Sequence, residues 1–356
     1  MSRKLKIGLI GLGGIMRNAH MAGYQRMWNM VEVVAICDIL PEKIESFKKQ
    51  FGMQDVPAYT DYKELLCVEG LDYVDICTPN YLHSIIAVDA LNKGVNVFCE
   101  KPDAVSVEEA LKMKEAAENS GKHLMVMRNN RYRRTAQYLK RYINEGKMGD
   151  IYCGRCGWQR RRGIPGKGGW FTTKEQSGGG PLIDLGVHMI DLAIWLMGNP
   201  TPVSVSGCTF TKFADSDVSD SVNSSFGDKK EGGTFDVEDL AMGFIRFDNG
   251  ACLQIEFSWA SNVEKESIFV ELRGDKSGAE IKDGVLKIYT EDNGVLEDIN
   301  PKLVDNNLIH GDNLRHFAEV LLHGKQPDFT PVQGVNMIKI LEAMYKSAET
   351  GCEVRL

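Results

Sequence analysis

Three ionisable residues recur along one apolar stretch of the sequence, at a spacing that aligns them on a helix. Asp184, His188 and Asp191 lie four and three residues apart, and a helix turns by about 100° per residue, so they form one stripe. The rest of Pro181–Trp195 is almost entirely apolar, which predicts a buried helix whose polar groups need partners. A neutral histidine accepts a proton near neutral pH. The stripe therefore indicates either a proton-handling site or a structural Asp–His pair.

A glycine-rich turn near the N-terminus has the spacing of a dinucleotide-binding fingerprint. Gly11 and Gly13 occupy the two positions at which the chain turns tightly and the backbone approaches a pyrophosphate. Met16 takes the third small position, a departure that weakens the expected packing of helix on strand. The N–H groups at the start of the following helix would hold the phosphates. Glycine-rich turns are common, so this motif needs support from its surroundings.

An acidic residue at the end of the second expected strand provides that support. Asp38 follows the run Val31–Cys37, and a carboxylate at this point accepts hydrogen bonds from the adenosine ribose and repels a 2′-phosphate. Ile39 and Leu40 come next, where an NADP-binding chain tends to carry an arginine. The sequence therefore predicts NAD rather than NADP. The alternative is that Asp38 is only a turn residue at a strand end.

A lysine follows another expected strand of the same sheet. The triplet Glu100-Lys101-Pro102 comes directly after Val95–Cys99. Open α/β sheets bind ligands at the carboxyl ends of their strands, so the ammonium group of Lys101 is expected near the nicotinamide. The alternative is a surface Glu–Lys pair in front of a proline.

The segment Gly154–Gly180 combines tryptophans, arginines and glycines, as the rim of a site for a polar ring would. Aromatic side chains stack on the apolar faces of sugar rings, and guanidinium groups donate to hydroxyls or acids. The candidate contacts are Trp158, Arg160, Arg162 and Trp170. The alternative is an arginine-rich surface strand followed by an ordinary loop.

Strands and helices alternate over the first part of the chain, which predicts βαβ units, a parallel sheet and an α/β fold. The expected order is strand Leu5–Ile10, helix Ala19–Met30, strand Val31–Cys37, helix Pro41–Phe51, strand Tyr73–Thr78, helix Tyr81–Asn92, strand Val95–Cys99, helix Val107–Ser120 and strand His123–Met127.

From residue 150 onward strand patterns dominate, which predicts a largely antiparallel sheet. The expected strands are Ile151–Trp158, Val203–Phe210, Asp239–Phe247, Ala251–Ser258, Ser267–Arg273, Ala279–Lys282 and Val285–Thr290. Asp248-Asn249-Gly250 indicates a tight hairpin between two of them. The Ser-, Asp- and Gly-rich segment Phe213–Asp236 is expected to be a long loop, and Asn313–His323 and Gly334–Thr350 are expected to be helices.

The composition fits a globular protein of two domains. The chain has 356 residues, of which 43% are hydrophobic, against roughly 150 residues for one domain. Its net charge of −7 disfavours a nucleic-acid partner, which needs a basic face. Nine cysteines, an odd count, predict reduced thiols in the cytoplasm. Cys153 and Cys156 fall on opposite faces of an expected strand and indicate no zinc site. We expect no membrane association, because no signal-peptide segment precedes the first strand and Pro181–Gly198 carries ionisable residues.

These segments together resemble the glucose-fructose oxidoreductase / inositol dehydrogenase (Gfo/Idh/MocA) family over nearly the full length of the chain. The matching segments are Gly11-Leu-Gly13, Thr78-Pro79-Asn80 with His83, Glu100-Lys101-Pro102, Glu145-Gly-Lys-Met-Gly149, Asp184-Leu-Gly-Val-His188 and Ala348-Glu-Thr-Gly351. The resemblance implies an N-terminal Rossmann domain with a doubly wound parallel sheet, residues 1–128. It implies a C-terminal α/β domain with an open, mostly antiparallel mixed sheet, residues 129–356. The C-terminal helix, residues 334–350, would pack back on the Rossmann domain, and the C-terminal sheet would form a homodimer or homotetramer.

The resemblance also implies the site residues. Lys101, Asp184 and His188 correspond to the catalytic group, in which His188 removes the hydroxyl proton, Lys101 stabilises the alkoxide and Asp184 orients the imidazole or binds a neighbouring hydroxyl. Either Lys101 or His188 can be the main base. The implied cofactor-binding residues are Gly11, Gly13, Gly14, Ile15, Met16, Asp38, Thr78, Pro79, Asn80, His83, Glu100 and Lys101. The implied substrate contacts are Asn129, Arg131, Trp158, Arg160, Arg162, Trp170, Asp184 and His188. No metal ligand is implied.

The sequence therefore predicts an NAD-dependent oxidoreductase that reversibly oxidises a ring CH–OH group of a sugar, glycoside or cyclitol to a ketone. Residues 160–198 are similar to a branch of the family that acts on glycosides, some members of which oxidise the 3-hydroxyl of a glucoside. One alternative is an NAD-dependent glycosidase that works by oxidation and elimination with no net redox change. A second is an inactive NAD-binding sensor. A third is a metal site at Asp184 and His188, for which the sequence offers no surrounding cluster of ligands.

Overall fold

The computed structural model describes residues 3–227, 229–304 and 308–356, and these form two compact units. The first unit comprises the described parts of Met1–Asn129 and Asn307–Val335, and the second those of Asn130–Asn306 and Asn336–Leu356. The helix α10 (Pro331–Thr350) belongs to both, with the division after Val335. The domain limits expected from the sequence, 1–128 and 129–356, and the packing of the C-terminal helix on the Rossmann domain stay predictions.

The first unit contains the expected parallel sheet, which has six strands in the order β3-β2-β1-β4-β5-β6. The strands are β1 (Leu5–Ile10), β2 (Val31–Cys37), β3 (Ala58–Tyr59), β4 (Tyr73–Ile76), β5 (Asn96–Cys99) and β6 (Leu124–Val126). The helices are η1 (Met16–His20), α1 (Met21–Tyr24), α2 (Pro41–Phe51), α3 (Tyr62–Leu65), η2 (Asn80–Leu82), α4 (His83–Asn92), α5 (Val107–Ser120) and α9 (Ile309–His323). The strand order reverses between β1 and β4, and at such a point an open α/β sheet binds its ligand.

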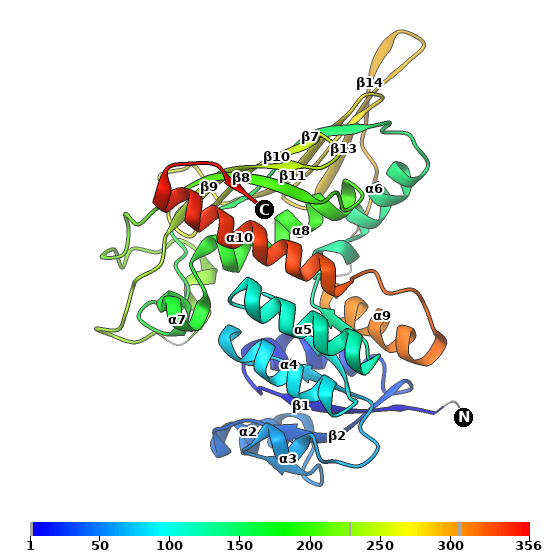
Figure 1. The fold of residues 1–356 in the computed structure, drawn as a ribbon, viewed down its shortest axis with the longest axis vertical. Helices are drawn as coiled ribbons and strands as arrows, with labels where there is room; N and C mark the ends of the chain where they lie inside the picture. Colours follow the sequence, from blue (N-terminus) through cyan, green and yellow to red (C-terminus); the bar gives the residue numbers. More distant parts are fainter. Residues whose placement is uncertain (1–2, 228, 305–307) are drawn as a thin grey trace. The chain divides into compact units, whose positions relative to one another are not determined.

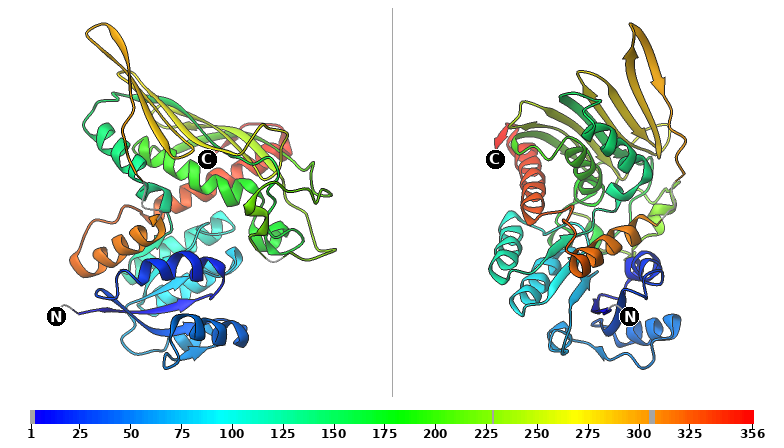
Figure 2. Two further views of the ribbon diagram at one scale, coloured as in Figure 1. Left: turned by 180° about the vertical axis from the view of Figure 1, so that it is seen from behind. Right: turned by 90° about the vertical axis from the view of Figure 1, so that its right-hand side faces the viewer.

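Helices lie on both faces of this sheet (Figure 1), and the side chains along β4 and β5 alternate between the two faces. On one face, Tyr73 and Phe98 contact Phe317 of α9 with ring centroids 5.1 and 5.4 Å away. Asp75 points to the same face, where η1 and α1 lie. The helices α4 and α5 lie against each other on the opposite face, as both views of Figure 2 show. The carboxylate of Asp75 in β4 thus points toward η1, the helix that follows the glycine turn.

The limits predicted for the helix Ala19–Met30 are wrong at both ends. The chain is already helical at Met16, as the π-helix η1, and α1 ends at Tyr24. Met16 is fully buried, so the residue that departs from the glycine fingerprint is packed into the start of this helix. Other limits are closer: the elements Val31–Cys37, Pro41–Phe51 and Val107–Ser120 are as predicted.

The second unit contains the expected open mixed sheet, with nine strands in the order β14-β13-β12-β11-β7-β10-β9-β8-β15. The strands are β7 (Ile151–Gln159), β8 (Pro202–Phe210), β9 (Leu240–Phe247), β10 (Cys252–Ser258), β11 (Ser267–Gly274), β12 (Gly278–Lys282), β13 (Val285–Asp292), β14 (Val295–Ile299) and β15 (Val354–Arg355). The helices are α6 (Arg134–Asn144), η4 (Trp170–Thr172), α7 (Lys174–Ser177), η5 (Leu182–Gly186), α8 (Val187–Leu196) and η6 (Val222–Ser225), and η3 (Asn129–Tyr132) precedes α6. Among the described strands, β7 and β10 pair in parallel and the other neighbours pair antiparallel.

Helices cover one face of the nine-stranded sheet. The central helix α8 lies against β7 and β11, and α6 lies against β12 and β13. Met344 of α10 packs so closely on Gly207 and Gly243 that a β-carbon at either glycine would collide with its sulfur or methyl group. No element of the described chain covers the other face, where Met242 and Phe244 are half-buried and Phe210 is 43% exposed.

Two segments differ in how well the sequence indicates them. The strand β14 is absent from the predicted elements, and its Leu296 is 86% exposed, so no buried face imposes a hydrophobic alternation on it. The expected loop Phe213–Asp236 contains only η6 and one isolated bridge, Gly168 to Thr234, among its described residues; residue 228 lies outside them. The segment Lys174–Leu196 is apolar enough to span a membrane, but 83% of its most apolar window is buried inside the second unit.

Candidate active site

The glycine turn after β1 shows which of its glycines the fold itself requires. Gly11 has a φ of 87°, and a β-carbon there would lie 2.6 Å from the carbonyl oxygen of Cys77. A β-carbon on Gly13 would meet no atom of the chain within 4 Å. Packing therefore accounts for Gly11 but not for Gly13, whose open surroundings fit the close approach of a phosphate group to the backbone.

Asp38 lies beside this turn at the carboxyl end of β2. Its Oδ2 accepts a hydrogen bond of 2.9 Å from the backbone N–H of Leu12, and its Oδ1 accepts one of 3.0 Å from the N–H of Leu40. Each carboxylate oxygen keeps a further lone pair that can accept a ribose hydroxyl. Asp38 thus stabilises the turn at the strand end, and its carboxylate can still accept further hydrogen bonds next to the glycine turn.

His83 joins the segments that follow β4 and β5. Its Nδ1 lies 2.8 Å from the carbonyl oxygen of Pro102, and its Nε2 lies 2.9 Å from that of Thr78. The side chain is buried, and burial lowers the pKa of His83. The ring therefore ties the Thr78-Pro79-Asn80 segment to the Glu100-Lys101-Pro102 triplet, and its expected contact with the cofactor stays a prediction.

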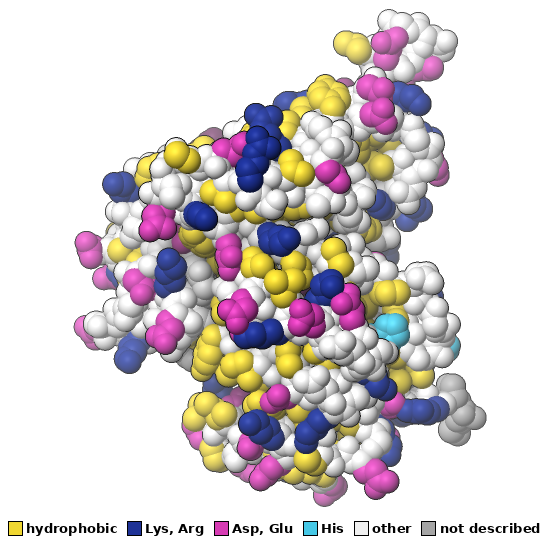
Figure 3. Space-filling model, viewed as in Figure 1, with side chains coloured by type: hydrophobic (Ala, Val, Ile, Leu, Met, Phe, Trp, Pro, Cys, Tyr) yellow, Lys and Arg dark blue, Asp and Glu magenta, His cyan; other side chains and the backbone are white. Residues whose placement is uncertain are grey.

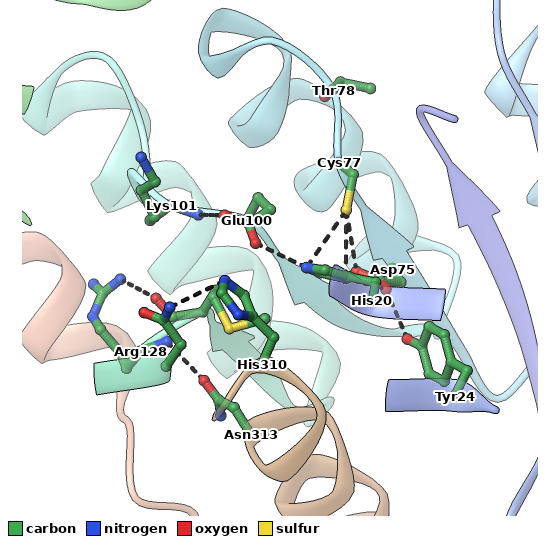
Figure 4. A network of polar contacts seen from close by, with 12 residues as sticks. His20, Tyr24, Asp75, Cys77, Thr78, Glu100, Lys101, Arg128, His310 and Asn313 are labelled. Carbon is green, nitrogen blue, oxygen red and sulfur yellow. Dashed lines mark hydrogen bonds and ion pairs between the residues drawn. The ribbon is translucent and has the colours of Figure 1, made fainter. Parts of the chain in front are cut away.

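A buried network of charged groups surrounds Glu100 (Figure 4). Glu100 accepts hydrogen bonds from His20 Nε2 at 2.8 Å and from the backbone N–H of Lys101 at 3.0 Å. The other ring nitrogen of His20, Nδ1, lies 2.7 Å from Asp75 Oδ2, which also accepts the Tyr24 hydroxyl at 2.7 Å. Figure 4 shows the side chain of Lys101 directed away from this network. Sequence reasoning missed His20 and Asp75, which lie 55 residues apart.

The charges in this network reinforce one another. Burial alone would lower the pKa of His20, but the charge and hydrogen bond of Asp75, with a further contribution from Cys77, together outweigh it, and the pKa is raised well above its ordinary value. Burial alone would raise the pKa of Glu100, but the hydrogen bond and charge of His20 lower it well below the usual range. His20 is therefore an imidazolium between two carboxylates.

In the second unit, the glycine-rich run leads into a helix whose half-buried side chains are Asp184, His188 and, near its end, Ile194. From Gly179 to Ala193 every residue is buried apart from Asp184 and His188. The helix begins as the π-helix η5 and continues as α8 from Val187. Asp184 and His188 therefore present polar groups at the surface of an otherwise apolar helix.

Aromatic and charged residues of the second unit surround Asp184 and His188. The indole N–H of Trp259 donates to Asp184 Oδ2 at 3.0 Å, and the ring of His188 lies 6.1 Å from that of Trp158. The guanidinium of Arg160 stacks over Trp158 at 5.1 Å. Burial lowers the pKa of Arg160, an effect that the Asp184 charge opposes. Trp158 and Arg160 thus border this pair, and their contact with substrate stays a prediction. Trp259 is an addition that sequence reasoning missed.

The third residue of the expected stripe has a different environment. Asp191 is buried and accepts two hydrogen bonds from Arg131, at 2.8 Å from Nε and 2.6 Å from Nη2. Arg131 is 1% exposed, and its guanidinium also lies 5.8 Å from the Trp195 ring. This bidentate ion pair joins η3 to α8, so the stripe divides into two surface groups and one buried structural group.

A buried glutamate caps the start of the helix that carries Asp184 and His188. Glu238 accepts hydrogen bonds from the backbone N–H groups of Gly180, at 3.0 Å, and Leu182, at 3.1 Å, and from the Tyr345 hydroxyl at 3.0 Å. Burial raises the pKa of Glu238, and these donors counter the rise only in part. Glu238 therefore fixes the glycine-rich run, although its own sequence surroundings give no indication of this role.

The remaining predicted site residues take varied positions. Arg162 donates to the Ser261 carbonyl at 2.8 Å and stacks over Phe213 at 4.1 Å. Trp170 stacks on Phe171 with ring centroids 3.9 Å apart. Asn129 contacts His310 Nε2 at 3.0 Å within the first unit. Each of these side chains has partners within its own unit, and their contacts with substrate stay predictions.

Comparison with known proteins gives one family match in each half of the chain. Residues 5–128 match the oxidoreductase family with an NAD-binding Rossmann fold, and residues 136–280 match the Gfo/Idh/MocA C-terminal domain. The fold and the glycine turn thus define an NAD-binding oxidoreductase. The chain belongs to the Gfo/Idh/MocA family, as its sequence motifs predict.

Relatives of known activity resemble the chain over most of its length. A D-glucoside 3-dehydrogenase of Escherichia coli (strain K12) is 34% identical over 359 residues, covering 100% of this chain and 98% of the relative. A levoglucosan dehydrogenase of Pseudarthrobacter phenanthrenivorans is 31% identical and covers 76% of this chain and 72% of its own. A solved levoglucosan dehydrogenase in complex with NADH and levoglucosan superposes with a TM-score of 0.84 at 23% identity, covering 99% of both chains. This last likeness concerns the fold.

Proposed function

We propose that this protein uses NAD to oxidise a ring hydroxyl of a sugar or glycoside to a ketone. The observation that carries the proposal is the exposure pattern from Gly179 to Ala193, where only Asp184 and His188 escape burial. A purely structural Asp–His pair would gain nothing from reaching the surface. Within an NAD-binding oxidoreductase, a carboxylate and an imidazole held by an apolar helix are suited to handling the proton of an alcohol.

The chain's own groups suit the expected cofactor. The backbone at Gly13 leaves room for a pyrophosphate, and Asp38 offers carboxylate lone pairs for the ribose hydroxyls. The other residues assigned to the cofactor are Gly11, Gly14, Ile15, Met16, Thr78, Pro79, Asn80, His83, Glu100 and Lys101. NAD, when bound, supplies an acceptor for the hydride that leaves the carbon. The protein must then remove the hydroxyl proton and stabilise the negative charge that forms on oxygen.

We assign these two tasks to His188 and Lys101. His188 accepts the proton at one ring nitrogen, and Lys101 donates a hydrogen bond to the developing alkoxide. Asp184, whose Oδ2 is held by Trp259, orients the imidazole or accepts a neighbouring hydroxyl of the substrate. Asn129, Trp158, Arg160, Arg162 and Trp170 are the proposed substrate contacts. Arg131, which the sequence also indicates, is 1% exposed and bound to Asp191, so its role is structural.

The substrate class follows from the relatives. The D-glucoside 3-dehydrogenase matches the whole chain, and the levoglucosan dehydrogenase acts on another sugar derivative, as its name states. We therefore expect a glucoside, oxidised at its 3-hydroxyl, as the preferred substrate. The rim of Trp158, Arg160 and Arg162 fits a polar ring with one apolar face.

A substrate panel with NAD tests this proposal. Purified protein is incubated with glucosides, free sugars and inositols, and formation of reduced cofactor is followed by absorbance. We expect glucosides to react fastest, and His188→Ala to lose about 100-fold or more in turnover while NAD binding, measured by calorimetry, is retained. Activity on inositols alone contradicts the glycoside assignment. Near-full turnover by His188→Ala contradicts the role of His188.

The same panel separates the alternatives. A glycosidase that oxidises, eliminates and reduces again would release the aglycone without accumulating reduced cofactor. An inactive sensor would bind NAD and show no turnover with any member of the panel. Either result replaces the dehydrogenase assignment while leaving the family membership untouched.

We further propose that the protein is a cytoplasmic homodimer or homotetramer formed through the nine-stranded sheet. All nine cysteines are free, which suits a reducing compartment. The face of the sheet that carries Phe210, Met242 and Phe244 lacks a cover in the described chain, and a second copy would bury it. Light scattering on the wild type and on Phe244→Glu tests this: the charged variant should shift toward a monomer.

A further inference from the structure

We propose that His20 is a positioning residue for Lys101, because it holds the carboxylate to which the main chain of Lys101 is hydrogen-bonded. The inference rests on the proposed role of Lys101 in the reaction. It adds a residue of η1 to the first unit's part of the proposed site, which otherwise consists of the segments after β2, β4 and β5.

The contacts place His20 between two parts of the same unit. It is the last residue of η1, the helix that follows the glycine turn. Through Glu100 it reaches the triplet after β5, where Glu100 Oε2 accepts the Lys101 N–H at 3.0 Å. The helix after the glycine turn and the peptide group of Lys101 are therefore linked through the side chains of His20 and Glu100, which are 0% and 5% exposed.

Charge explains why this position needs a histidine. His20 is the cation between Asp75, at 2.7 Å, and Glu100, at 2.8 Å. Buried carboxylates that lose a cationic partner must protonate or turn toward water. Without His20, Glu100 would be free to leave the Lys101 amide, and the start of the Lys101 side chain would lose its fixed direction.

The hydrogen bonds around His20 fix the position of Glu100 and do not form a proton path. From His20 the hydrogen bonds continue through Asp75 to the Tyr24 hydroxyl, and Tyr73 donates to that hydroxyl at 3.4 Å. Asp75, Tyr24 and Tyr73 are all 0% exposed, so these contacts lead a proton into the interior. A relay would need an exit to solvent or to the substrate at this end.

The network is not arranged as a metal site either. His20, Asp75 and Cys77 do bring possible ligand atoms within 4.8 Å of one another. However, His20 Nδ1 and Asp75 Oδ2 are 2.7 Å apart, whereas two such ligands of one tetrahedral zinc ion, each about 2.0 Å from the metal, lie roughly 3.3 Å apart. The observed separation is that of a charge-assisted hydrogen bond.

Two substitutions of His20 distinguish its two contacts. Asparagine places an amide near the position of Nδ1, so His20→Asn keeps a donor for Asp75 but loses the one for Glu100. Glutamine reaches the position of Nε2, so His20→Gln keeps a donor for Glu100. We expect His20→Asn to lower kcat by about 100-fold, the cost of a misplaced catalytic group. His20→Gln should recover part of this loss, because its amide keeps the hydrogen bond to Glu100 but not the positive charge. KM for NAD should change less than threefold in both.

Tyr24→Phe is the matched control, because it removes a buried hydrogen bond from the same network at the Asp75 end only. It should lower the free energy of unfolding without lowering kcat. If Tyr24→Phe lowers kcat as much as His20→Asn does, the effect is general packing and the proposal is wrong.

A double-mutant cycle with Lys101→Met separates this inference from the proposed function. If His20 acts through Lys101, His20→Asn should have no further effect on kcat in the Lys101→Met background. Full turnover by Lys101→Met alone would overturn the role of Lys101 itself. Loss of turnover by Lys101→Met, together with normal turnover by His20→Asn or with additive losses in the double variant, would overturn the role of His20.

Discussion

Two buried glutamates, one in each unit, stand next to proposed catalytic residues in opposite electrostatic environments. Glu100 precedes Lys101 and faces the imidazolium of His20. Glu238 caps the helix of Asp184 and His188 and faces two backbone N–H groups and the Tyr345 hydroxyl. Their exposures are alike, at 5% and 7%, yet the pKa of Glu100 is lowered, chiefly by His20 against the effect of burial, and that of Glu238 is raised by burial.

The comparison shows what burial demands of a carboxylate. A full positive charge at hydrogen-bond distance outweighs the loss of hydration, so Glu100 remains ionised and can hold a fixed charged network. Dipolar donors counter that loss only partly, so Glu238 is pushed toward its neutral form and acts mainly through geometry. In the first unit, the charges of Glu100 and His20 fix the segment of Lys101. In the second unit, Glu238 fixes the start of the helix of Asp184 and His188 through hydrogen bonds from the backbone.

The matched substitutions Glu100→Gln and Glu238→Gln should separate these two cases most strongly. Removing the charge of Glu100 leaves the His20 imidazolium with one carboxylate instead of two, and we expect a loss of about 3 kcal/mol in the free energy of unfolding. The isosteric change at Glu238 should cost less, about 1–2 kcal/mol, because it removes a charge that faces dipolar donors and turns the new amide NH2 toward one of them. Urea unfolding at pH 7 measures both values. Equal losses would show that the two environments do not differ as described.

Much of the frame around these glutamates could be predicted from the sequence. The strand Val31–Cys37 and the helices Pro41–Phe51 and Val107–Ser120 have strong local patterns and clear ends. The helix expected at Ala19–Met30 instead includes Met16 and ends at Tyr24, limits that follow tertiary packing, since Met16 and Tyr24 are both fully buried. The exposed strand Val295–Ile299 was missed because an edge strand without a buried face carries no hydrophobic alternation.

The site could be predicted only where its residues are close in the sequence. The spacing of Asp184 and His188 is a local property and indicated a pair, but no spacing shows that Asp191 is committed to Arg131. His20 and Glu100 are 80 residues apart, and Glu238 lies 58 residues from Gly180. These partners meet only through tertiary folding. The one available indication was Asp75, a charged residue inside an apolar strand, which must have a buried partner.

The pH dependence of stability should have opposite signs at the two glutamates. The pKa of Glu100 is lowered in the folded protein, so its contribution is present above an unfolded pKa of about 4.3 and is lost as the pH falls. The pKa of Glu238 is raised, so the folded state binds the extra proton, and stability falls as the pH rises from the unfolded to the folded pKa. Relative to wild type, Glu238→Gln should therefore become more favourable as the pH rises above about 4.3, whereas Glu100→Gln should become less favourable as the pH rises toward about 4.3 and should change little above it.

Thermal and urea unfolding of the three proteins at several pH values tests these slopes. Pairwise differences between variants cancel the titrations that all three share. Parallel curves for the two variants would mean that the two pKa values do not shift in opposite directions on folding, which contradicts the assigned environments.

The smallest expected difference concerns the tyrosines that donate to the two networks. Tyr24 donates to the Asp75 carboxylate at 2.7 Å, next to the His20 charge, and Tyr345 donates to Glu238 at 3.0 Å. A hydrogen bond to an ionised acceptor contributes more than one to a neutral acceptor, so Tyr24→Phe should cost about 2 kcal/mol and Tyr345→Phe about 1 kcal/mol. Both substitutions keep the aromatic ring, so packing changes little. If Tyr345→Phe proves the more costly in urea unfolding at pH 7, Glu238 is ionised in the folded protein, and the contrast between the two glutamates lies in geometry alone.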